Sequence, residues 1–116
     1  MPFYNVFNNT NILILFYTYR TPLHADVFTS FSWSINVCGR KRWLLFPKGE
    51  EDYLRDKFGH LAYDATALEM NDEKLYPTYK HLKFSIEVIQ EAGEAIFVPS
   101  GWHHQVWNMV SKFVKN

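Results

Sequence analysis

Residues 31–38, FSWSINVC, alternate large apolar side chains with small or polar ones at every position. A period of two is typical of a β-strand, because successive side chains point to opposite faces of a sheet. One face would carry Phe31, Trp33, Ile35 and Val37, and the other face would be small and polar. The pattern therefore predicts a strand with a packed apolar face.

Several other short runs are rich in β-branched and aromatic residues and end at glycine or proline, as strands often do. They lie at residues 12–19, 42–46, 83–90, 95–99 and 102–108. Gly39 would allow a tight turn, so we expect the strands at 31–38 and 42–46 to form a hairpin. Acids come first and bases last in residues 49–58, before Gly59, which predicts a short helix.

These elements favour an all-β, mainly antiparallel domain. With 116 residues the chain suits one domain, and its aromatic content of 18% favours a core of large flat side chains. Residues 60–80 show no period and are expected to form a loop. The sum is a jelly roll or barrel with one short surface helix.

Charge and cysteine content narrow the function classes. Twelve basic residues balance twelve acidic ones, so the net charge gives no sign of a nucleic acid or an anionic membrane as partner. Cys38 is the only cysteine, so no intrachain disulfide can form, and we expect a cytoplasmic or nuclear location. The apolar run ILILFY is far shorter than the ~20 residues of a membrane span. The N-terminus also lacks the features of a secretory signal.

The segment TPLHADVF at 21–28 places a histidine and an aspartate two positions apart. On a strand, His24 and Asp26 would point the same way, with backbone positions ~6.5–7 Å apart, and could converge on one metal ion. They would supply two of the three ligands of the 2-His-1-carboxylate triad found in non-haem Fe(II) oxygenases. A simple hydrogen bond between the two side chains at a strand end is the ordinary alternative.

A third ligand is available in VPSGWHHQVWN at 98–108. His103 and His104 follow a Pro-Ser-Gly turn on a predicted strand and would point to opposite faces, so at most one of them fits the site. Periodicity does not choose between them. It also stays open that neither is a ligand, with one histidine solvated and the other a core residue. His60 and His81 have no partner at ligand spacing and are expected at the surface.

Three ordered motifs resemble the jumonji-C family of Fe(II)- and 2-oxoglutarate-dependent oxygenases. They are HAD at 24–26, GRKRW at 39–43 and PSGWHHQVWN at 99–108. The resemblance implies a double-stranded β-helix, which is a jelly roll of the cupin-like kind, and leaves open whether its sheets are complete at the two ends. It also implies a catalytic core at 21–110. We expect an N-terminal strand segment at 1–20, whose relation to the family pattern is open, and a short tail outside that pattern at 111–116.

By this resemblance, the iron ligands are His24, Asp26 and His104, since the second histidine of WHH falls at the family's ligand position. Lys41 falls where the family has the lysine that pairs with the distal carboxylate of 2-oxoglutarate. A buried cation on a strand is costly unless an anion meets it, which agrees with that role. Without the motif, Lys41 would be one more exposed base in the RKR run. Thr21 matches a hydroxyl that holds the same carboxylate.

Other polar residues of the expected interior carry weaker assignments. Asn108, four positions after His104, matches a polar contact of the family near the co-substrate. At Ser34 some relatives carry an asparagine, so its contact is open. Ser34 and Asn36 share the polar face of the strand at 31–38, where a barrel interior would need them.

The segments SFSWSINVCGRKRWLLFP and EAGEAIFVPSGWHHQV most resemble the branch of the family that hydroxylates a lysine of a translation termination (release) factor. The implied reaction couples decarboxylation of 2-oxoglutarate to succinate and CO2 with hydroxylation of a protein lysine. The partner would be a protein, with no direct nucleic acid and no membrane. Two alternatives stay open: a catalytically inactive β-barrel module that acts by protein interaction, and a cupin-like protein that binds Zn²⁺ or Mn²⁺ without redox chemistry. The two ends depart from the family pattern, which suggests a truncated form of low stability.

Overall fold

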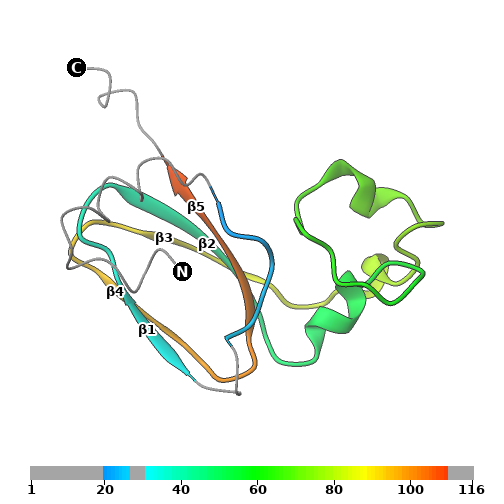
Figure 1. The fold of residues 1–116 in the computed structure, drawn as a ribbon, viewed down its shortest axis with the longest axis horizontal. Coiled ribbons are helices and arrows are strands. Elements are labelled where there is room, and N and C mark those ends of the chain that lie inside the picture. The colour runs from blue at the N-terminus through cyan, green and yellow to red at the C-terminus, as the bar shows by residue number, and fades with distance from the viewer. Residues whose placement is uncertain (1–19, 27–30, 110–116) are drawn as a thin grey trace.

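The computed structural model describes residues 20–26 and 31–109 (Figure 1). Its strands are β1 Ser32–Ile35, β2 Arg40–Phe46, β3 Ile86–Gln90, β4 Ala95–Val98 and β5 His103–Met109. They form two antiparallel sheets with the strand orders β3-β2-β5 and β1-β4. The prediction of an all-β, mainly antiparallel fold of the jelly-roll kind is confirmed. The predicted strand at 12–19 lies outside the described residues, and the division at 1–20, 21–110 and 111–116 stays a prediction.

The two sheets pack face to face at one end of the molecule (Figure 1). Their shared interior holds a cluster of buried residues from both sheets: Trp43, Leu45, Val98 and Val106. Because strand side chains alternate, β2 presents its odd-numbered residues, from Lys41 to Leu45, to this interior. Its even-numbered residues face the other way. The space between the sheets is therefore the core of the β-sandwich.

The expected hairpin between 31–38 and 42–46 is wrong. Strand β1 pairs with β4, whereas β2 lies between β3 and β5. Gly39, with φ of +72°, turns the chain out of one sheet and into the other instead of back on itself. Two backbone hydrogen bonds fix the segment that passes between the sheets. Asn36 N–H donates to the Glu94 carbonyl at 3.0 Å, and Gly93 N–H donates to the Asn36 carbonyl at 2.7 Å.

The packed apolar face expected at 31–38 is wrong, whereas the expected place of Ser34 and Asn36 in the interior is confirmed. The large apolar side chains of this segment are exposed, Phe31 by 63% and Trp33 by 64%, while the small polar residues Ser34 and Asn36 are buried. The exposed rings of Phe31 and Trp33 both pack on Phe97 of β4 on the outer face. The interior thus selects the small polar face of β1, which leaves room beside the bulky residues of β2.

Residues 47–85 form a lobe at the other end of the molecule (Figure 1). The predicted helix at 49–58 is a shorter 3-10 helix, η3 Glu50–Leu54, because Arg55 turns to an extended conformation and bridges to Leu61. The segment expected as a loop contains two more 3-10 helices, η4 Leu68–Asn71 and η5 Tyr79–His81. These short elements surround a second cluster of buried residues: Leu23, Phe46, Leu54, Ala62, Ala65, Met70 and Tyr76.

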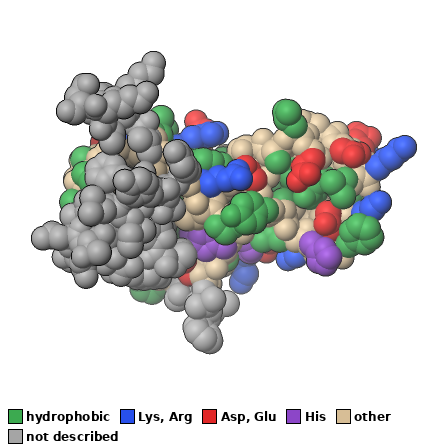
Figure 2. All heavy atoms as spheres, turned by 45° about the horizontal axis from the view of Figure 1, so that its top comes forward, with side chains coloured by type: hydrophobic (Ala, Val, Ile, Leu, Met, Phe, Trp, Pro, Cys, Tyr) green, Lys and Arg blue, Asp and Glu red, His purple; other side chains and the backbone are tan. Residues whose placement is uncertain are grey.

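The surface of the lobe carries charged side chains of both signs, interspersed with apolar ones (Figure 2). This distribution agrees with the balanced charge of the sequence. Within residues 20–26 and 31–109, no helix has the length and apolar character needed to cross a membrane.

Candidate metal centre

The segment at 20–24 runs antiparallel to β5 as a short edge strand. Backbone bridges join Arg20 to Trp107 and His24 to His104. The second bridge has two hydrogen bonds: His24 N–H donates to the His104 carbonyl at 3.1 Å, and His104 N–H donates to the His24 carbonyl at 2.7 Å. Pairing therefore places the two histidines directly opposite each other, although about eighty positions separate them in the sequence.

The structure brings His24, Asp26 and His104 together. One ligand atom from each residue lies within 4.8 Å of the others. The distance from His104 Nε2 to Asp26 Oδ1 is 4.0 Å, and the two imidazole ring centroids are 4.4 Å apart. In the described part of the chain, this is the one group of three such residues close enough to hold a metal ion.

Both imidazoles are oriented by a backbone carbonyl. His24 Nδ1 lies 2.8 Å from the Pro22 carbonyl oxygen, and His104 Nδ1 lies 3.0 Å from the Trp102 carbonyl oxygen. A carbonyl can only accept, so each Nδ1 carries the proton and each Nε2 keeps a lone pair for a metal. His24 Nε2 is buried and has no hydrogen-bond partner among the described residues. A buried nitrogen left open in this way fits a metal ligand.

The carboxylate is oriented as well. Ser32 Oγ donates a hydrogen bond to Asp26 Oδ2 at 2.7 Å, which leaves Oδ1 directed at the histidines. The three donors are therefore two imidazole nitrogens and one carboxylate oxygen. That donor set suits a borderline divalent ion such as Fe(II) and is less suited to calcium or magnesium, which prefer oxygen ligands alone.

Burial also favours the neutral form of the second histidine. Only 2% of the His104 side chain is exposed. This burial lowers the pKa of His104, and although the hydrogen bond to the Trp102 carbonyl opposes the shift, the net direction is down. A neutral imidazole is the form that binds a metal.

A second polar group lies further along the same interior face. Lys41 is buried on β2, and its Nζ donates to Asn108 Oδ1 of β5 at 3.0 Å. Burial lowers the pKa of Lys41. Lys41 pairs in register with Asn108, and Leu45 pairs with His104, so the two rows are four residues apart, or about 13 Å along the strands. The ammonium and the metal donors therefore lie toward opposite ends of one interior face.

The remaining predicted residues differ in what they contact. Thr21 is buried, and its Oγ1 accepts a hydrogen bond from Val106 N–H at 3.1 Å, which leaves its own O–H to donate. Ser34 Oγ is buried and has no hydrogen-bond partner among the described residues. Asn36 has a structural role, because its Nδ2 donates to the carbonyls of Gly39 at 2.7 Å and Gln90 at 3.3 Å.

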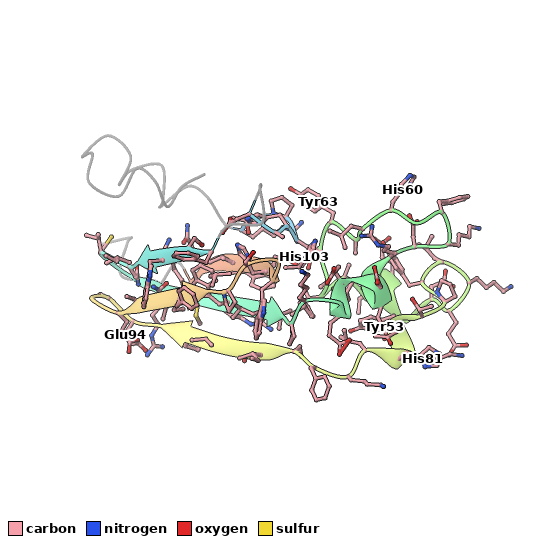
Figure 3. All side chains as sticks on the ribbon, turned by 90° about the horizontal axis from the view of Figure 1, so that it is seen from below. Tyr53, His60, Tyr63, His81, Glu94 and His103 are labelled. Carbon is pink, nitrogen blue, oxygen red and sulfur yellow. The ribbon has the colours of Figure 1, made fainter. Side chains whose placement is uncertain are left out.

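The other histidines do not join the site. His103 points to the opposite face of β5, where its Nδ1 lies 3.8 Å from Glu51 Oε1 at the start of the lobe. Burial lowers the pKa of His103. His60 and His81 are exposed on the lobe, away from His103 (Figure 3), as the sequence predicted.

Three buried or second-layer polar residues were not identified from the sequence. Ser32 lies on the polar face of the 31–38 alternation, so the signal for it was present. Gln90 continues the period-two pattern of Phe84, Ile86 and Val88, which could have placed it inside. Gln105 carries no such signal, yet it is buried and its Oε1 accepts from Ala65 N–H of the lobe at 3.0 Å.

Comparison with known proteins identifies the family. Residues 18–114 match the family described as JmjC domain, hydroxylase. The chain is similar to 2-oxoglutarate and iron-dependent oxygenase JMJD4 of Mus musculus, with 61% identity over 89 residues that cover 77% of this chain and 21% of that protein. The Homo sapiens protein of the same name is 57% identical over the same coverage.

Similarity extends to a plant protein with a different name. Arginine-specific demethylase JMJ20 of Arabidopsis thaliana is 52% identical over 90 residues, which cover 77% of this chain and 19% of that protein. The chain thus spans about a fifth of the length of the curated relatives it matches. Because most of its length matches the family, the chain belongs to the JmjC-domain family.

Proposed function

We propose that this domain binds Fe(II) and 2-oxoglutarate and acts in an oxygenase that hydroxylates a lysine side chain of a translation termination factor in the cytoplasm. The observation that carries the proposal is the convergence of His24, Asp26 and His104, each with one donor atom left open toward the others. The names of the JMJD4 relatives supply the metal and the co-substrate.

The chain's own residues would hold the two reactants. His24 Nε2, His104 Nε2 and Asp26 Oδ1 would hold the metal, and Lys41 would hold the far end of the co-substrate. The bound iron supplies the oxidation, which is coupled to decarboxylation of 2-oxoglutarate to succinate and CO2. The contribution of the protein is to fix this geometry and to exclude water from the interior.

The spacing along the interior face suits a short dicarboxylate. The row of Lys41 and Asn108 lies about 13 Å from the row of His104 along the strands, and the lysine side chain spans part of that gap. A molecule with one end on the metal could place its distal carboxylate at Lys41 Nζ. That contact would offset the cost of the buried ammonium. The O–H groups of Thr21 and Ser34 are available to donate to the same carboxylate.

The substrate is proposed as a lysine because two long segments of the chain most resemble the lysyl hydroxylase branch of the family. A cytoplasmic location fits the single cysteine of the sequence. Demethylation of arginine is the second candidate, because the 52%-identical relative from Arabidopsis thaliana carries that activity in its name. Both reactions would use the same metal and co-substrate, so the product distinguishes them.

The test is an anaerobic titration of the purified chain with Fe(II) and 2-oxoglutarate, monitored for a visible charge-transfer band. We expect a band that requires both additions, is lost in Lys41→Met, and persists in His103→Ala. His103 is the matched control because it is the neighbouring histidine on the opposite face of β5. A folded chain that gives no band would reject the proposal.

If the band forms, mass spectrometry of candidate proteins after incubation with dioxygen identifies the product. The gain of one oxygen atom on a lysine of a termination factor supports the lysyl hydroxylase. Loss of a methyl group from a methylated arginine peptide, with no gain of oxygen on lysine, would replace it with the demethylase.

A further inference from the structure

The buried side chain of Gln90 on β3 holds together three parts of the sandwich. Only 1% of the residue is exposed. Its Oε1 accepts a hydrogen bond from the indole Nε1–H of Trp43 at 2.8 Å. Its Nε2 donates to the Ser34 carbonyl of β1 and the Glu94 carbonyl of the β3–β4 turn, both at 3.0 Å. One amide therefore links β2, β1 and the β3–β4 turn.

The direction of this amide is fixed by its partners. The indole of Trp43 can only donate and the carbonyls of Ser34 and Glu94 can only accept, so a reversed amide would lose all three hydrogen bonds. A glutamate at position 90 would face two carbonyl oxygens with a carboxylate. Among side chains of similar length without an ionisable group, only glutamine can both accept from the Trp43 indole and donate to the two carbonyls. The contacts therefore require glutamine itself.

The tryptophan that Gln90 holds lies against a metal ligand. The Trp43 ring is 5.8 Å from the His104 ring, centroid to centroid, with an angle of 32° between the planes. Trp43 is itself buried and occupies the row between Lys41 and Leu45 on the interior face of β2. Rotation of the indole would therefore change the packing of the His104 imidazole.

Gln90 also lies beside the expected co-substrate contacts. It pairs in register with Lys41 on the neighbouring strand, so the two share one interior row with Asn108. Its bond to the Ser34 carbonyl fixes the strand whose buried Oγ is open to a ligand. The same amide thus contacts the wall of the metal site and the wall of the co-substrate site.

We infer that Gln90 is a positioning residue, which keeps Trp43 packed on His104 and holds β1 at the distance that the co-substrate needs. The inference rests on the proposed function. It predicts that removal of the amide loosens both the metal site and the co-substrate site even though Gln90 touches neither ligand. Partners that orient a metal ligand typically contribute about 10- to 100-fold to metal affinity.

The test compares Gln90→Met with Gln105→Met. Gln105 is a second buried glutamine, but its side chain bonds to the lobe and faces away from the sandwich interior. Affinities for Fe(II) and 2-oxoglutarate come from the anaerobic band, and thermal unfolding measures stability. We expect Gln90→Met to weaken binding about tenfold and to shift the band. Gln105→Met should lower the unfolding temperature while the band keeps its position and affinity.

Trp43→Phe tests the connection through the indole, because it removes the N–H and keeps a ring beside His104. If the link is correct, the double variant with Gln90→Met binds metal no worse than Gln90→Met alone, since both changes break the hydrogen bond between Trp43 and Gln90. Fully additive losses would overturn the link. Should Gln90→Met fail to fold, unchanged metal affinity in Trp43→Phe would overturn it instead.

The outcomes separate this inference from the proposed function. Wild-type protein that is folded and gives no band rejects the proposed function, and the inference with it. Wild-type protein that gives a band, with the same band and affinity in folded Gln90→Met, rejects the inference alone. Equal losses in Gln90→Met and Gln105→Met would also reject it, because the effect would then follow from stability.

Discussion

The two buried regions of this molecule enclose different chemistry. The lobe cluster consists of seven apolar residues, and Glu50 is the one buried charged or polar side chain within the lobe at 47–85. Its carboxylate accepts hydrogen bonds from the backbone N–H groups of Lys83 and Phe84. The sandwich interior has four buried apolar residues. Beside them it buries Ser34, Asn36, Lys41, Gln90 and His104.

The two regions are therefore held together by different forces. Apolar packing stabilises the lobe in proportion to the area that it removes from water. The sandwich interior contains polar groups that cost free energy unless each one meets a partner. Some of them meet partners within the chain, and others have atoms that fit a ligand. The lobe is thus built for stability, whereas the sandwich interior has the polar groups that the proposed binding role needs.

The largest expected effect is on the metal. His104→Ala removes one of the three proposed ligands, and we expect the Fe(II) affinity to fall by at least about a hundredfold, with loss of the charge-transfer band. The measurement is the anaerobic titration. A His104→Ala variant that keeps the wild-type band would show that the sandwich interior is not the metal site.

The next effect concerns the lobe. Leu54 is completely buried, so Leu54→Ala should lower the free energy of unfolding by about 3 kcal/mol through lost packing and a cavity. Urea denaturation measures the loss, and titration of the still folded variant should give wild-type metal affinity. An altered affinity in folded Leu54→Ala would mean that the two regions are coupled.

A smaller effect is expected at the second layer of the site. Ser32→Ala removes the hydrogen bond that leaves Asp26 Oδ1 directed at the histidines. We expect the Fe(II) affinity to fall about tenfold with little change in stability. Isothermal titration with Fe(II) under anaerobic conditions measures it. Equal affinity in Ser32→Ala would show that Asp26 keeps its orientation without the serine.

The smallest effect is on the pH dependence of folding stability in the ligand-free chain. Burial lowers the pKa of Lys41 in the folded chain, so between that pKa and the unfolded value of about 10.5 the unfolded state binds more protons. Stability should therefore rise with pH through this window. Lys41→Met removes the group and should lack this part of the rise. Identical pH profiles of chemical denaturation in the two proteins would contradict the burial of the ammonium.

Much of the candidate site could be predicted because its residues are spaced by strand geometry. The two-residue separation of His24 and Asp26 and the Pro-Ser-Gly turn before His104 are local signals, and the structure brings these residues together. The choice of His104 over His103 needed the resemblance, since alternation alone treats the two faces equally. Their roles as iron ligands stay predictions.

The pairing of β1 could not be predicted from local signals. Alternation at 31–38 indicates a strand but does not say which face is inside. The usual preference for buried apolar residues predicted a packed apolar face, which is wrong, whereas the interior place of Ser34 and Asn36 is correct. The face is decided by the opposite sheet, where Trp43 and Leu45 already fill the interior and polar side chains are needed beside Lys41. The hairpin failed for a related reason, because the turn at Gly39 joins different sheets.

The bridge between His24 and His104 has a consequence for the chain as a polymer. The edge segment is joined to β5 by a few backbone hydrogen bonds, and one ion bound by both histidines would close a loop of about eighty residues. In an unfolded chain, closing such a loop costs an entropy on the order of 4 kcal/mol at room temperature. In the folded chain the pairing of the edge segment with β5 has already closed this loop, so metal binding adds no such entropy loss. Metal would therefore bind tightly only after the ends of the domain have come together, and once bound it would keep them from separating.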